Sequence, residues 1–126
     1  MTATQVIQLV EETISWQPAH ISGNEANLQV AQRLQNLLVA DRASVIEAMR
    51  TYLAFRVTAK QRKPEDALSE SRLLMALDVA EILTLAELLP DIELLVADVR
   101  SGEVFLPVHA SGISRYLNVL QRALES

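Results

Sequence analysis

Both histidines of the chain occur in one six-residue pattern, Pro-x-His-x-Ser-Gly, which contains His20 in residues 18–23 and His109 in residues 107–112. A histidine beside a serine could act as a general base, and two histidines could share a metal ion. Serine catalysis also needs an orienting group and oxyanion donors, which the pattern lacks. The favoured interpretation is a turn used twice, in which proline ends one helix and serine caps the next. We therefore expect His20 and His109 to offer partner contacts, without catalysis or metal binding.

A second group with chemical potential is a basic stretch between residues 50 and 63 that contains no acid. Its five cations are Arg50, Arg56, Lys60, Arg62 and Lys63. Such a patch could hold a phosphate or another anion, or contact an acidic partner. The spacing of Arg56, Lys60 and Lys63 also suits the end of a helix, where cations are favoured by the helix dipole. A solvated helix end is the favoured interpretation, and a partner- or anion-binding surface is the alternative.

Acidic residues and glycines predict no further site. Asp78 and Glu81 lie one helical turn apart, but the Glu-x-x-His pairs of di-iron bundles are absent. The chain contains no cysteine, and its three glycines are isolated. We expect no catalytic residue, no metal site and no cofactor, and a metal-dependent hydrolase is the weakest of the functions considered.

Composition predicts an all-α protein with one domain over residues 1–126. Half of the 126 residues are apolar and only 4% are aromatic, so the core must be built mainly from leucine, valine, isoleucine and alanine. Good helix formers dominate, and three glycines and four prolines provide few breaks. A chain of this length can bury roughly two thirds of its unfolded surface, so it needs no disulfide.

Charge and hydropathy indicate a cytoplasmic protein that does not enter a membrane. Residues 1–63 carry seven Lys/Arg against five Asp/Glu, whereas residues 64–126 carry four against eleven. Nucleic acid is therefore an unexpected partner, above all for the acidic second half. The first residues lack the features of a signal peptide, and the longest apolar run, Leu73–Leu77, is far shorter than the ~20 residues of a membrane span.

Three of the prolines mark an internal repeat. Pro18, Pro64 and Pro107 are spaced by 46 and 43 residues, and the apolar residues around them recur at fixed offsets. Ten residues after the prolines stand Leu28, Leu74 and Leu117, and thirteen after them stand Ala31, Leu77 and Leu120. Upstream, an i, i+3, i+4, i+7 stripe precedes each proline, broken only by Arg56. The pattern predicts three helical hairpins at approximately 1–40, 41–88 and 89–126.

The six predicted helices run over residues 4–16, 23–39, 42–59, 65–87, 91–100 and 112–125. Asp41 is a suitable N-cap for the third of these helices, and Pro64-Glu65-Asp66 is typical of a first turn. The segment from Leu73 to Leu89 has only a narrow polar stripe, so we expect it to be the most deeply buried.

The chain resembles HEAT-like, armadillo-type α-helical repeat proteins. Their repeats are helix pairs of about 40–47 residues, and the stretch from Leu88 to Arg100, with its leucine-proline entry followed by Asp98 and Arg100, is the most similar to the family. The resemblance implies a short right-handed α-solenoid of three stacked antiparallel hairpins; the alternative is a compact helical bundle. It also implies a non-enzymatic scaffold that binds a protein partner or a second copy of itself. The competing function is a binder of a small anionic or phosphorylated ligand through residues 50–63.

Overall fold

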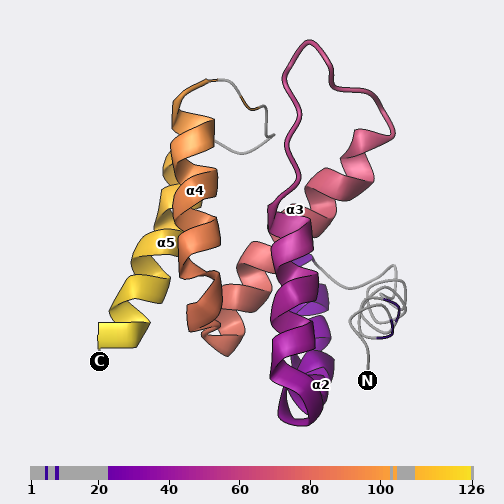
Figure 1. Cartoon of the computed structure of the whole chain (residues 1–126), viewed down its shortest axis with the longest axis vertical. Coiled ribbons are helices and arrows are strands. Elements are labelled where there is room, and N and C mark those ends of the chain that lie inside the picture. Colours follow the sequence, from indigo (N-terminus) through magenta and orange to yellow (C-terminus); the bar gives the residue numbers. More distant parts are fainter. Residues whose placement is uncertain (1–4, 6–7, 9–22, 103, 105–109, 126) are drawn as a thin grey trace.

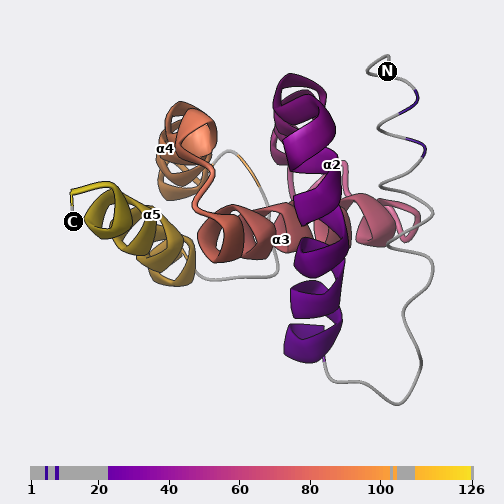
Figure 2. The ribbon, with the colours of Figure 1, turned by 90° about the horizontal axis from the view of Figure 1, so that it is seen from below.

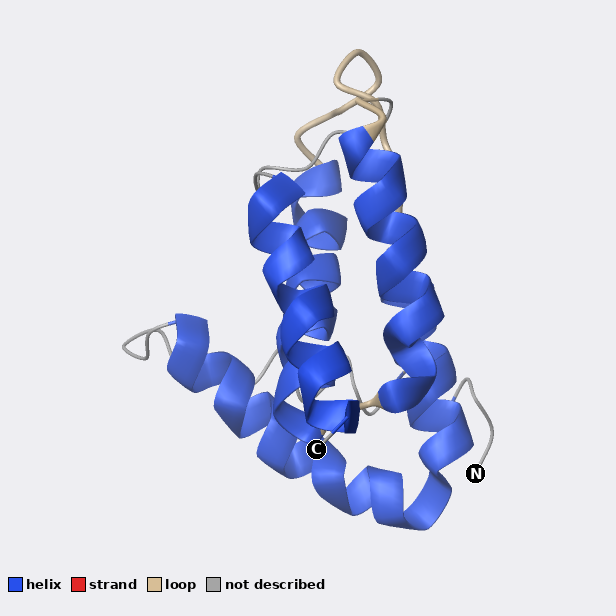
Figure 3. Cartoon of the chain, turned by 90° about the vertical axis from the view of Figure 1, so that its left-hand side faces the viewer, coloured by secondary structure: helices blue, strands red, loops and turns tan. Residues whose placement is uncertain are grey.

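The computed structural model describes residues 5, 8, 23–102, 104 and 110–125. Within these ranges the chain forms four α-helices and one short 3-10 helix, with no strand (Figures 1 and 3). The all-α class predicted from composition is confirmed. Six separate helices are not found in the described ranges: the predicted helix 4–16 lies almost wholly outside them, and helices 23–39 and 42–59 are joined into one.

The joined helix is α2, Gly23–Leu53, and it bends at Asp41. The backbone of Asp41 is extended there (φ −158°, ψ 81°), and Figure 3 shows two helical arms that meet at the bend near the bottom of the picture. The Asp41 carboxylate accepts hydrogen bonds from the amide of Ser44 at 3.2 Å and from its hydroxyl at 2.8 Å. These bonds lower the pKa of the Asp41 carboxyl. Asp41 is thus the N-cap of the second arm, as predicted, although no loop separates the arms.

The second arm of α2 ends at Leu53, six residues before the predicted end, and residues 54–65 form a loop. The guanidinium of Arg56 provides the physical reason. Its Nη1 donates to the carbonyl oxygen of Leu53 at 2.6 Å and to that of Phe55 at 2.8 Å. The Leu53 carbonyl would otherwise accept the next bond of a continuing helix, so the side chain acts as a C-cap.

Helix α3, Asp66–Leu83, begins close to the predicted residue and ends earlier than predicted. Thr84 adopts a left-handed conformation (φ 51°, ψ 59°). The amide of Leu85 donates to the carbonyl of Ala80 at 3.0 Å, and that of Thr84 donates to Glu81 at 3.4 Å. This pair of bonds is the Schellman motif, which normally has glycine at the left-handed position. With threonine there instead, the sequence contained no stop signal for the helix.

The described elements after α3 are one 3-10 helix and two α-helices. The 3-10 helix η1, Ala86–Leu88, leads directly into α4, Leu89–Arg100, which has Pro90 in its first turn and begins two residues before the predicted start at residue 91. The last helix is α5, Ala110–Glu125. In Figure 1, α4 rises beside the second arm of α2, while α3 and α5 run back down.

The helices pack in two layers. Figure 2 shows α4 and the second arm of α2 in one layer and α3 and α5 in the other, with the first arm of α2 crossing α3. The contacts agree: α2 packs on α3 and α4 packs on α5 within the predicted hairpins, and α2 meets α4 and α3 meets α5 between them.

The core lies between the layers and is densest around α3. Leu73, Leu77, Val79 and Ala80 are fully buried, and the next turns add Leu85 and Leu88. The predicted deep burial of residues 73–89 is confirmed at these positions, whereas Ile82 is 42% exposed. Buried residues also recur at the predicted repeat offsets, namely Ala31, Leu77 and Leu120 after the prolines and Met49 and Ile92 before them. The offset of ten residues is less well buried, because Leu28 is 45% exposed and Leu74 and Leu117 are only partly buried.

Candidate functional site

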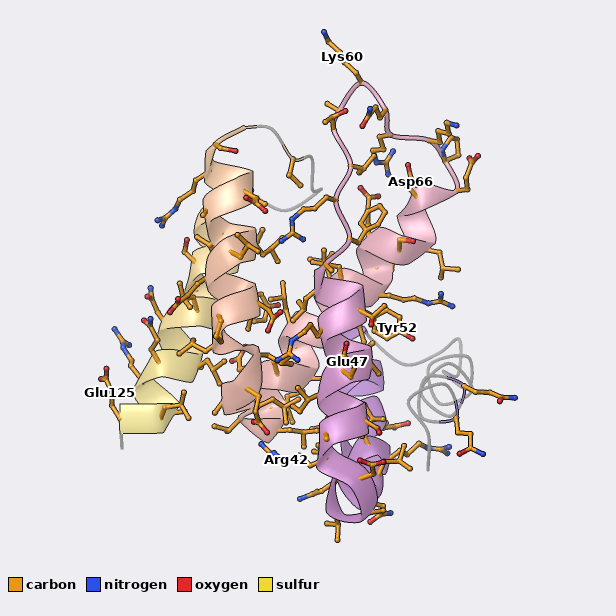
Figure 4. All side chains as sticks on the ribbon, viewed as in Figure 1. Arg42, Glu47, Tyr52, Lys60, Asp66 and Glu125 are labelled. Carbon is orange, nitrogen blue, oxygen red and sulfur yellow. The ribbon has the colours of Figure 1, made fainter. Side chains whose placement is uncertain are left out.

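The five predicted cations lie on two different elements. Arg50 is in the last turn of α2, whereas Arg56, Lys60, Arg62 and Lys63 belong to the loop 54–65. The prediction that Arg56, Lys60 and Lys63 lie at the end of a helix was therefore wrong, because the helix has already ended at Leu53. Figure 4 shows Lys60 at the tip of the loop, directed away from the helices.

Arg50 and Arg56 join α2 and its following loop to α4. The Nε of Arg50 lies 3.2 Å from both carboxylate oxygens of Asp91, and its Nη2 donates to the carbonyl of Glu87 at 3.3 Å. The bond to Asp91 raises the pKa of the Arg50 guanidinium. The Nε of Arg56 donates to Asp98 at 3.0 Å. Both guanidinium groups therefore already hold carboxylates of the same chain.

A third arginine, outside the predicted basic stretch, extends this row of ion pairs. Arg42, just after the bend of α2, contacts Glu87 through Nε at 2.5 Å and Nη2 at 2.9 Å. The hydrogen bonds from Arg42 lower the pKa of Glu87 to about 2. Together the pairs Arg42–Glu87, Arg50–Asp91 and Arg56–Asp98 follow the parallel course of α2 and α4.

Arg62 is also engaged, while the two lysines are exposed. The guanidinium of Arg62 makes three hydrogen bonds of 2.8 to 3.2 Å to Glu70, whose side chain is only 3% exposed. Lys60 and Lys63 lie on the surface of the loop. Of the residues predicted to bind an anion, the three arginines are paired with carboxylates. The two lysines are exposed to solvent.

The predicted turn contacts His20 and His109 lie outside the described residues, as do Pro18 and Pro107. Within the described ranges, no three residues of the types His, Cys, Asp and Glu lie close enough to hold a metal ion. In the same ranges, no helix is both long and apolar enough to cross a bilayer.

The acid Asp78 of α3 binds a tyrosine of α5. The Tyr116 hydroxyl donates to the Asp78 carboxylate at 2.5 Å. Burial of the phenol, together with this bond, raises the pKa of Tyr116 to about 12. This hydrogen bond links α3 to α5.

One concave site was missed in the sequence. A groove of about 290 Å³ lies between the end of α2 and the first turns of α3, and it is lined by Thr51, Tyr52, Ala54, Phe55, Ser69 and Arg72. The guanidinium carbon of Arg72 lies 6.0 Å from the centre of the Tyr52 ring. The sequence signal was weak: a serine and an arginine three residues apart, before an apolar run.

Comparisons of the chain with protein-family models, with curated proteins and with solved structures find no match. The residues and their geometry are therefore the basis on which a function can be argued.

Proposed function

We propose that this protein is a short HEAT-like repeat that binds a protein partner, or a second copy of itself, without catalysing a reaction. The observation that carries the proposal is the exposed apolar surface of the last hairpin. Leu94 of α4 is 59% exposed and Leu124 of α5 is 43% exposed. α4 and α5 lie at one side of the molecule, where the described chain provides no further helix to cover them (Figure 1).

The repeat interpretation is supported by equivalent burial in successive hairpins. Met49 and Ile92 stand at the same offset before their prolines and are both fully buried, and Leu53 and Val96 are a second such pair, 1% and 4% exposed. In a helical repeat each unit packs only on its neighbours, so a terminal unit keeps one face without a repeat against it. The complete proposal is a right-handed stack of three hairpins and six helices, with residues 4–16 as the first; a compact bundle is the alternative.

The competing function, anion binding through residues 50–63, has weaker support. An anion at Arg50, Arg56 or Arg62 must displace the carboxylate of Asp91, Asp98 or Glu70. Lys60 and Lys63 would then have to bind it alone from an exposed loop. No observation favours that arrangement over a solvated loop.

The test combines light scattering after size exclusion with capture experiments on tagged protein. We expect a dimer or a complex with an identified protein, reconstituted from purified components. The double variant Leu94→Glu, Leu124→Glu should abolish it, because each change places a charge in the proposed contact. Val39→Glu is the matched control, since Val39 is an apolar residue that is 87% exposed and lies on α2, outside the last hairpin.

A protein that remains monomeric at all concentrations and captures no partner would contradict the proposal. So would a complex that the double variant forms as well as the unaltered chain does. Circular dichroism of the variants establishes that the helices are retained.

A further inference from the structure

Eleven Lys and Arg residues offer sites to a protease that cuts after a basic side chain, and all of them lie among the described residues. Seven belong to helices: Arg33, Arg42, Arg50, Arg72, Arg100, Arg115 and Arg122. A protease binds its substrate as an extended segment, so a bond inside a helix is accessible to it only after the helix opens. The four others are in the loop 54–65, namely Arg56, Lys60, Arg62 and Lys63.

The two arginines of the loop are held by carboxylates. Arg56 donates through Nε to Asp98 at 3.0 Å, and its side chain is 23% exposed. Arg62 donates to Glu70 through Nε and Nη2 at 2.8 to 3.2 Å. A trypsin-like protease must bind the basic side chain in a pocket whose own aspartate pairs with it. Each guanidinium would therefore have to leave its present carboxylate before the adjacent bond could be cut.

Lys63 is protected by the residue that follows it, which is Pro64. Serine proteases cut such a bond poorly, because the proline ring crowds the residue before it and the proline nitrogen carries no hydrogen. The amide of Lys63 also donates to the carboxylate of Asp66 at 2.8 Å, which holds the backbone of Lys63 at the start of α3.

Neither obstacle applies to Lys60. Residues 59–65 are exposed, and Lys60 lies at the tip of the loop with its side chain directed away from the helices (Figure 4). The backbone bonds nearest to it run from the amides of Gln61 and Arg62 to the carbonyl of Thr58, at 3.1 and 3.0 Å. They lie inside a single turn, so this turn can open while α2 and α3 stay intact. Exposed loop tips of this kind are the preferred sites of proteolytic nicking.

We propose that a trypsin-like protease cuts the folded chain once, at the bond between Lys60 and Gln61, and that the two products stay together. The hydrolysis consumes one water molecule: the bond from the Lys60 carbonyl carbon to the Gln61 nitrogen breaks, Lys60 gains a carboxylate and Gln61 gains an amino group. The products are residues 1–60 and 61–126. Leu94 and Leu124 remain on one product, so the proposal does not depend on the partner binding proposed above.

The contacts that would join the two products are already present in the uncut chain. α2 packs on α3 and on α4, and Arg42, Arg50 and Arg56 pair with acids that lie beyond residue 60. The core also combines both parts, since Met49 and Leu77 are fully buried in one cluster. The nicked protein should therefore keep its helices and its size. Its midpoint of thermal unfolding should rise with protein concentration, because two chains must now assemble.

The test is limited digestion of the native full chain with trypsin, followed by mass spectrometry of the fragments. The first products should end at Lys60 and begin at Gln61. Lys60→Gln should slow the loss of intact chain about tenfold or more, because every remaining site precedes proline or requires an ion pair or a helix to open. Lys60→Arg should restore the cut. Lys63→Gln is the matched control: it removes an equal charge from the same loop and should be cut as fast as the unaltered chain.

A first cut after Arg56, Arg62 or a residue within a helix would overturn the proposal, and so would equal digestion rates for Lys60→Gln and the unaltered chain. Size exclusion and circular dichroism of the nicked protein test whether the products stay together. Fragments that separate, or that lose their helical signal, would contradict the proposed association.

Discussion

Arg62 encloses the carboxylate of Glu70 from outside, with Nε 3.2 and 3.0 Å from its two oxygens and Nη2 2.8 Å from Oε1. The two side chains differ in exposure: Arg62 is 35% exposed, whereas Glu70 is 3% exposed. Glu70 is the one buried charged residue among those described. The pair thus joins the loop 54–65 to α3. Without its partner Arg62 could still be hydrated, whereas the buried carboxylate of Glu70 could not.

This asymmetry predicts unequal effects of mutation. Arg62→Ala leaves a buried carboxylate without these donors and should lower the free energy of unfolding, because a buried charged group without hydrogen bonds is costly. Glu70→Gln should cost less, because the amide fits the same space and Arg62 can still be hydrated. Urea denaturation of both variants at pH 7 measures the difference. A larger loss of unfolding free energy for Glu70→Gln than for Arg62→Ala would show that the unpaired buried carboxylate does not dominate the cost of breaking the pair.

The Arg42–Glu87 pair predicts an acid-sensitive contribution to stability. The pKa of Glu87 is lowered from 4.5 to about 2 in the folded protein, so its contribution is present above pH 4.5 and is lost as the pH falls from there towards 2. Glu87 is 40% exposed, and solvent screening therefore limits the effect to about 0.5–1 kcal/mol at low salt.

The measurement is the difference in unfolding free energy between the unaltered chain and Glu87→Gln, followed from pH 7 to pH 3. The difference should shrink as the pH falls and should also shrink in high salt. Glu93→Gln, at an exposed position of α4, serves as the control. A difference that stays constant with pH would exclude a role for the charge.

Tyr116 is expected to titrate at about pH 12, above the ordinary value of 10.0. A raised phenol pKa means that its contribution to stability is complete below pH 10 and is lost between pH 10 and 12. The chain has two tyrosines, so ultraviolet titration of Tyr52→Phe reports Tyr116 alone. Asp78→Asn should bring its pKa closer to 10 by removing the carboxylate, and an unchanged titration would argue against the bond.

Thr84 is the position at which a glycine is expected to stabilise the fold. A β-branched residue at φ 51° is strained, whereas glycine adopts that region without steric cost. Thr84→Gly should raise the free energy of unfolding by about 0.5–1 kcal/mol after the added entropy of the unfolded chain is subtracted. Ser71→Gly, at an exposed interior position of α3, should lower it. Thermal unfolding of the two variants and of the unaltered chain shows whether each change raises or lowers the stability.

The sequence predicted the helical class, the cap at Asp41, the start of α3 to within one residue and much of the core, because apolar periodicity and prolines act locally. It failed at the helix ends decided by a single side chain or dihedral angle. Arg56 was interpreted as a helical residue that breaks an apolar stripe, yet it folds back to cap Leu53. The basic stretch was misjudged for a related reason: its acidic partners, Glu70, Asp91 and Asp98, are 8 to 42 residues away, and only the packed helices bring them close.

The bend at Asp41 sets the direction of the first arm of α2 relative to the second. The first arm of α2, from residue 23 to residue 40, is about 27 Å long at 1.5 Å per residue, and its direction is set by the two dihedral angles of one residue. A rotation of about 20° there would swing the far end through about 9 Å while leaving both helical arms internally intact. The two hydrogen bonds between Asp41 and Ser44 hold the second arm at the bend, so replacing either partner would change the direction of the first arm before it changed the helical content of that arm.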